Sequence, residues 1–175
     1  MEKGGALRYS KHAVELGEEC NMRVAIASDH GGYDQKDQIA AYIARIGHEV
    51  ADYGPHTPDP VDYPDYADKV ARAVARGEVD RGVLICGTGL GMAITADKVP
   101  GVRAAAIQSV ELAELFRQHN DGNVIALSGR FVDLETNLRL VKIFLETPHS
   151  DDERHNRRVA KAMREDDPAF EGVSD

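Results

Sequence analysis

Apolar positions along the chain follow two alternating periods from residue 22 onward. Short apolar runs are typical of buried strands, and the stretches between them show the i, i+3, i+4, i+7 spacing of helices that bury one face. Alternation of this kind is typical of βαβ units around a parallel sheet. The pattern predicts an α/β fold with a five-stranded parallel sheet, its strands at residues 23–27, 49–53, 82–86, 102–107 and 123–127.

Three helical stripes separate or follow these strands. The last of them ends at Pro148, because proline cannot continue a helix. The stripes consist of Ile39, Tyr42, Ile43 and Ile46, then Tyr66, Val70, Ala73 and Val74, and finally Leu134, Leu138, Val141 and Leu145.

We expect a single domain over residues 22–165, with a leader at 1–21 and a loose tail at 166–175. The leader has no clear apolar period, and we expect it to be flexible or to form a short helix. Two interpretations stay open: the leader has a role of its own, or Met22 is the biological start. The chain has no internal repeat or low-complexity linker, so the sequence does not support a second domain.

The segment at residues 150–165 is highly charged and reads as a solvated helix. Its apolar residues are too few to anchor the helix to the hydrophobic core of its own chain. Packing on a partner subunit explains this helix better. Those apolar residues are Val159, Ala160, Ala162 and Met163.

Composition and charge narrow the function. The chain has 175 residues, 42% of them hydrophobic, and a net charge of −9. A chain of this size buries a full core without disulfides, and its acidity argues against a general affinity for nucleic acid or anionic membranes. No apolar stretch is long enough to span a membrane, and Cys20 and Cys86 do not form a metal or dithiol motif. We expect a cytoplasmic protein whose phosphate site, if it has one, is local.

The strongest chemical signal is the strand that ends in Cys86 and breaks into Gly87-Thr88-Gly89-Leu90-Gly91. Alternating glycines let backbone N–H groups approach an anion closely. The loop is not a dinucleotide fingerprint, because Met92 stands where a glycine or alanine is required. The dipole of the following helix would favour a thiolate at Cys86, although a buried cysteine packed as a small apolar residue fits the spacing equally well.

Other candidates have structural readings of their own. Asp29, ahead of two glycines, suits a helix cap, which would leave His30 as a surface histidine. His119 stands beside Asn120-Asp121-Gly122, which is turn chemistry. The histidines lack metal-ligand spacing, so no metal site is predicted. Taken together, we expect the thiol, the glycine loop, the carboxylate and both histidines to project from one edge of the sheet, where open α/β sheets bind ligands.

Five motifs occur in an order that resembles the type B ribose-5-phosphate isomerases, the family that also holds the allose-6-phosphate and galactose-6-phosphate isomerases. The resemblance runs from about residue 22 to 163. The motifs are Ser28-Asp29-His30-Gly31-Gly32, Asp62-Tyr63-Pro64, Ile85-Cys86-Gly87-Thr88-Gly89-Leu90-Gly91, Arg117-Gln118-His119-Asn120-Asp121 and Arg154-His155-Asn156-Arg157-Arg158.

The resemblance implies a three-layer Rossmann-like fold, a homodimer or tetramer with active sites shared between subunits, and a phosphorylated sugar as substrate, without cofactor or metal. It implies an aldose–ketose isomerase that interconverts ribose 5-phosphate and ribulose 5-phosphate. A 6-phosphohexose isomerase and a non-catalytic sugar-phosphate binding protein are the alternatives. One branch of the family replaces the cysteine by a nearby Glu, but residues 93–96 contain none, so the cysteine branch matches better.

The same resemblance assigns roles to residues. Cys86 would be the base that moves a proton between C2 and C1, and His119 the acid that opens the furanose ring, assisted by Asp29. The loop from Gly87 to Gly91, with Thr88, would hold the enediolate. The phosphate would be clamped by His30, Arg130, Arg154 and Arg158, some from the partner chain, and the sugar lined by Asn120 and Tyr63.

Overall fold

The computed structural model describes residues 7–9, 21–170 and 172, and it contains a six-stranded sheet in the order β1-β3-β2-β4-β6-β5. The strands β2 to β6 all run parallel, which confirms the predicted five-stranded parallel sheet. The strands are β1 (Leu7–Tyr9), β2 (Arg23–Ser28), β3 (Glu49–Asp52), β4 (Arg81–Cys86), β5 (Ala104–Ala106) and β6 (Val124–Ser128).

The sixth strand, β1, lies in the leader and pairs antiparallel with β3 at the sheet edge. The sequence predicted no strand before Met22, and for Leu7–Tyr9 that expectation is wrong. Three residues are too few to show a period, and it is the open edge of β3 that offers them hydrogen-bond partners. The remainder of the leader, 1–6 and 10–20, lies outside the described residues.

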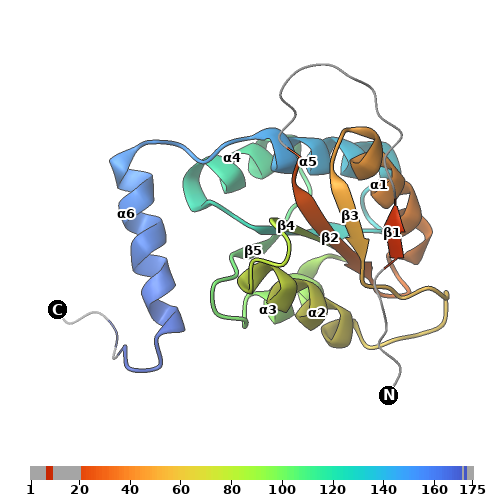
Figure 1. The fold of residues 1–175 in the computed structure, drawn as a ribbon, viewed down its shortest axis with the longest axis horizontal. Coiled ribbons are helices and arrows are strands. Elements are labelled where there is room, and N and C mark those ends of the chain that lie inside the picture. The colour runs from red at the N-terminus through yellow and green to blue at the C-terminus, as the bar shows by residue number, and fades with distance from the viewer. Residues whose placement is uncertain (1–6, 10–20, 171, 173–175) are drawn as a thin grey trace.

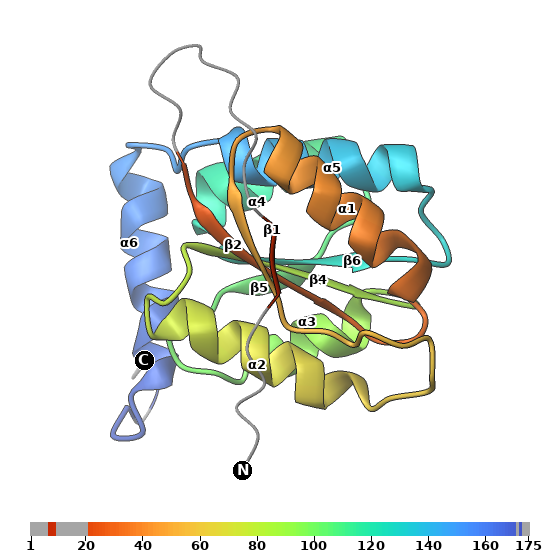
Figure 2. The same cartoon turned by 45° about the vertical axis from the view of Figure 1, so that its right-hand side comes forward.

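The helices form two layers around the sheet. α1, α4 and α5 cover one face, and α2 and α3 cover the other (Figures 1 and 2). The result is the three-layer Rossmann-like arrangement that the family resemblance implied. The helices are α1 (Tyr33–Arg45), α2 (Tyr63–Ala75), α3 (Leu90–Ala96), α4 (Val110–Asn120), α5 (Leu134–Glu146) and α6 (Glu153–Ala162), followed by a 3-10 turn at Met163–Asp166.

Alternate residues of each strand contribute to opposite faces of the sheet. Val83 and Ile85 of β4 pack in the cluster under α1 and α5, whereas Leu84 and Cys86 pack in the cluster under α2 and α3. The second cluster is rich in alanine, including Ala27 and Ala126. This register directs Cys86 toward α3 and the loop that precedes it.

The C-terminal helix α6 stands beside the sandwich and packs on α4 (Figure 1). Within α6, all of which the structure describes, His155 is the one buried residue. Most of the helix surface is therefore exposed, as the charged sequence predicted. Among the residues that the structure describes, none covers its outer face.

A buried ion pair joins α1 to the end of β3. Lys36 Nζ lies 2.5 Å from Asp52 Oδ2, and both side chains are 1% exposed. Burial alone would lower the pKa of Lys36, but the hydrogen bonds and charges of Asp52 and Asp37 together outweigh it and raise that pKa. Asp52 Oδ1 accepts from the N–H of Gly54, whose carbonyl accepts from the N–H of Ser28. The pair thus braces the residue that precedes Asp29.

Replacing Lys36 should destabilise the fold strongly. Lys36→Met leaves the Asp52 carboxylate buried without its lysine partner, which costs about 3–5 kcal/mol of unfolding free energy. Urea denaturation followed by circular dichroism measures the loss. Lys142→Met, which removes an exposed lysine of α5, should cost less than about 1 kcal/mol. Equal small losses in the two variants would contradict the role given to the buried pair.

Candidate active site

Three loops meet at the carboxyl ends of β2, β4 and β6. The N–H of Asp29 donates to the carbonyl of Ile85 at 3.0 Å, and the N–H of Gly129 donates to the carbonyl of Cys86 at 2.8 Å. A Cβ at Gly31 would lie only 2.8 Å from the amide nitrogen of Gly87. The loops pack backbone against backbone, and only glycine permits that approach at Gly31.

Cys86 lies at the centre of this contact. The residue is 4% exposed, as expected for a packed strand-end cysteine, yet its sulfur faces the loop: the N–H of Gly89 donates to Sγ at 3.1 Å. Gly89 has φ +80°, the left-handed conformation that turns its amide back toward the sulfur. A backbone N–H in this position stabilises negative charge on the sulfur.

The N-cap of α1 is Gly32, which has no side-chain cap hydrogen bond, so the prediction of a helix cap at Asp29 is wrong. Asp29 instead closes the turn between β2 and α1. Its Oδ1 accepts from the amides of Gly31 at 2.7 Å and Gly32 at 3.1 Å, and the residue is 8% exposed. His30, next in the chain, is exposed. These two hydrogen bonds hold the Asp29 carboxylate within the loop that contacts Gly87.

Side chains from two other segments lie over the glycine loop. The Tyr63 ring lies over Gly91, 2.9 Å from where a Cβ would stand, and the Arg130 side chain lies over Gly87 at 3.3 Å. Thr88 Oγ1 accepts from the N–H of Leu90, which is exposed at the start of α3. The structure thus brings ten predicted residues to this end of the sheet: Asp29, His30, Tyr63, Cys86, Gly87, Thr88, Gly89, Leu90, Gly91 and Arg130.

Sequence reasoning missed one residue of this group. Gln108 Nε2 donates to the carbonyl of Thr88 at 3.4 Å and so links the β5–α4 connection to the glycine loop. Gln108 follows an apolar strand without any motif, so the pattern carried no signal for it.

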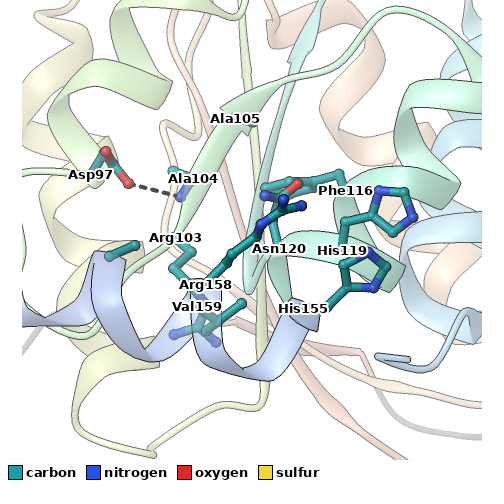
Figure 3. A pocket seen from close by; sticks show the side chains of 11 residues that line it. Asp97, Arg103, Ala104, Ala105, Phe116, His119, Asn120, His155, Arg158 and Val159 are labelled. Carbon is teal, nitrogen blue, oxygen red and sulfur yellow. Dashed lines mark hydrogen bonds between the residues drawn. The ribbon is translucent and has the colours of Figure 1, made fainter. Parts of the chain in front are cut away.

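A second group of predicted residues lines a cavity of about 560 Å³ between α4, β5 and α6 (Figure 3). His119 and Asn120 enter it from the end of α4, and Arg158 enters it from α6. Arg154 lies one turn before Arg158, exposed, with Nη2 3.2 Å from Asp152 Oδ2. Among the described residues that line the cavity, none belongs to the glycine loop.

The expectation that His119 shares an edge of the sheet with Cys86 is wrong. α4 starts beyond the carboxyl end of β5 and returns against the strand direction, so its last residue, Asn120, lies just before the start of β6 at Val124. An eleven-residue helix spans about 16 Å at 1.5 Å per residue. Within one chain, the thiol and this imidazole therefore stand at opposite ends of the sheet.

His155 is a further residue of the second group that the sequence analysis gave no role. Its ring centroid lies 4.1 Å from that of His119 (Figure 3). Burial lowers the pKa of His155, and the charge of the neighbouring His119 lowers it further. The residue sits inside the Arg154–Arg158 motif, but the surrounding charges made it look like part of a solvated helix face.

The part of the chain that the structure describes holds no group of three or more His, Cys, Asp or Glu side chains arranged to bind a metal ion. The helices in those residues are all too short or too polar to cross a bilayer.

Comparison with known proteins identifies the family. Residues 24–162 match the family described as Ribose/Galactose Isomerase. The chain belongs to this family. Another member, ribose-5-phosphate isomerase B of Escherichia coli, is 44% identical over 137 residues, which cover 78% of this chain and 91% of that protein.

Solved structures of family members have the same fold. The type B ribose 5-phosphate isomerase of Trypanosoma brucei superposes with a TM-score of 0.81 at 43% identity, covering 83% of this chain and 99% of that one. Ribose-5-phosphate isomerase B of Mycoplasma genitalium, solved with bound ribulose-5-phosphate, gives a TM-score of 0.78 at 41% identity, covering 82% and 95%.

The backbone contact at Gly31 supplies a test of the site. In Gly31→Ala the new methyl group would force the first loop away from Gly87, and displacements of about 1 Å can cost on the order of 10²-fold in rate. We expect aldose–ketose isomerase turnover to fall by that order. Gly77→Ala is the control, because Gly77 has φ +67° with open space around it and lies outside both groups. It should cost about 1 kcal/mol of stability and leave turnover unchanged; equal losses of turnover would contradict the assignment.

Proposed function

We propose that this protein interconverts ribose 5-phosphate and ribulose 5-phosphate through an enediolate. The observation that carries the proposal is the Cys86 sulfur, hydrogen-bonded to Gly89 N–H inside a glycine loop that also contacts the Asp29–Gly31 segment. Membership of an isomerase family supports it, as does the relative that binds ribulose-5-phosphate.

Cys86 is the proposed base. Its thiolate takes the proton from C2 of the open-chain aldose, the C2–H electron pair forms the C1–C2 double bond, and the carbonyl pair moves to O1. The hydroxyl proton of O2 then passes to O1 as the carbonyl forms at C2, and the carbon proton returns from Cys86 to C1 to give the ketose. Amides of the loop from Gly87 to Gly91, together with Thr88, hold the oxyanion of the enediolate. Each such donor is worth roughly 2.7–4 kcal/mol at comparable sites.

The remaining predicted residues bind and open the sugar. His119 gives a proton to the ring oxygen as the furanose opens, with Asp29 assisting at the anomeric hydroxyl. Arginine forks suit a phosphate dianion because they pair with it through two hydrogen bonds. The phosphate ligands are His30, Arg130, Arg154 and Arg158, and Asn120 and Tyr63 line the sugar.

A complete site needs two copies of the chain. The residues around Cys86 and the residues around His119 lie at opposite ends of one sheet. They can meet only if the cavity of one copy faces the glycine loop of another. The exposed surface of α6 and the exposed apolar residues Leu90 and Ile94 on α3, at 56% and 63% exposure, support such packing. We therefore propose a homodimer or tetramer with shared active sites, located in the cytoplasm.

Purified protein should interconvert the two pentose phosphates without added metal, and Cys86→Ala should abolish the reaction. Removing the base leaves no acceptor for the C2 proton, and general bases contribute about 10²–10⁴-fold. A coupled spectrophotometric assay, run in parallel on allose 6-phosphate and galactose 6-phosphate, measures kcat/KM for each sugar. Higher kcat/KM on a hexose phosphate would favour that substrate, and wild-type protein inactive on all of them would reject the isomerase.

Mixing two inactive variants should restore activity if sites are shared. Cys86→Ala and His119→Ala are unfolded together and refolded as an equal mixture. Half of the dimers then pair the two variants, and each such pair has one intact site of two, so activity should reach about one quarter of wild type. Each variant refolded alone is the control. A mixture no more active than the single variants would contradict the shared site.

A further inference from the structure

The stacked histidine pair carries an inference about the ring-opening step, and this inference rests on the proposed function. His119 from α4 and His155 from α6 stack with centroids 4.1 Å apart and planes inclined by 38° (Figure 3). His155 is 7% exposed, whereas His119 is half-buried at the cavity wall. His155 therefore forms a rigid backing behind an imidazole that faces the cavity.

Two contacts define the protonation of His155. Its Nδ1 lies 2.7 Å from Ser150 Oγ, and its Nε2 lies 3.4 Å from Arg154 Nη2. An arginine nitrogen can only donate, so Nε2 is the acceptor and the ring proton is on Nδ1, which donates to Ser150. Ser150 is itself anchored, since its N–H donates to the carbonyl of Gln118, next to His119.

The surroundings of His155 favour its neutral form. Burial lowers the pKa of His155, the charges of His119, Arg154 and Arg158 lower it further, and the charge of Asp152 raises it. Asp97 and Arg103 are further charged residues that line the same cavity.

We propose that His155 is a positioning residue for ring opening: as a neutral Nδ1–H imidazole it packs on His119 and fixes that ring at the cavity wall. His155 does not touch the sugar in this role. It acts only through His119, so its effect belongs to the ring-opening half of the reaction and not to enediolate formation at Cys86.

Ribulose 5-phosphate separates these halves. Its C5 oxygen carries the phosphate, so it cannot close a furanose ring, and its enolisation needs Cys86 but no ring-opening acid. Enolisation is measured in D₂O as deuterium gained at C1 plus aldose formed. His155→Ala should lower turnover of ribose 5-phosphate by on the order of 10²-fold, the low end of a general acid's contribution, and leave enolisation of ribulose 5-phosphate at the wild-type rate.

The controls address folding and stacking. His149→Ala removes a histidine that precedes α6 and whose Nε2 contacts Asn156 of that helix, and it should leave both rates unchanged. His155→Phe keeps a neutral ring against His119 and should recover part of the loss seen with Ala, which also keeps the test usable if the Ala variant does not fold. In the wild type, ¹⁵N spectra at pH 7 should show His155 as the neutral Nδ1–H tautomer.

Three results would overturn the proposal: a protonated or Nε2–H His155, equal losses of both rates in His155→Ala, or a Phe variant as impaired as the Ala variant. Wild-type protein that processes neither sugar would instead reject the proposed isomerase, while the tautomer measurement would still report on the histidine pair itself.

Discussion

The backbone contact between Gly31 and Gly87 is the constraint on which the arrangement around Cys86 depends. Parallel strands bring their carboxyl ends together, but only the absence of side chains lets the loops touch. That contact places the Asp29 carboxylate beside the glycine loop and leaves the loop amides directed at Cys86. The Lys36–Asp52 pair adds support from beneath, through Gly54 and Ser28.

The common direction of the strands brings the residues around Cys86 together and places those around His119 at the other end of the sheet. A helix that links parallel strands must run back against them, so its end lies at the far edge of the sheet. His119 and Asn120 occupy that end of α4, and α6 meets them there. The separation of the candidate catalytic residues between two ends of the sheet is thus a property of the fold. It also explains why α6 buries few of its residues within its own chain.

Much of this could be predicted from the sequence, because the relevant signals are local. The five parallel strands follow from apolar runs, and the glycine loop follows from three glycines after a buried strand. The misplacement of His119 came from treating a turn before a strand as if it were a turn after one. β1, Gln108 and His155 gave no local signal: the first depends on a free sheet edge, the second on a loop far along the chain, and the third on the docking of α6.

The alanine-rich packing beneath α3 affects the distance between the glycine loop and the sheet. Ala27 and Ala126 lie in the cluster under α2 and α3, and a Cβ at Gly89 would already be 3.1 Å from the carbonyl oxygen of Ala126. The clearance at Gly89 is therefore set by the backbone of β6, with the small alanine side chains of the cluster beside it. Larger side chains in place of these alanines would push the glycine loop away from the Cys86 sulfur, even with all strands still paired.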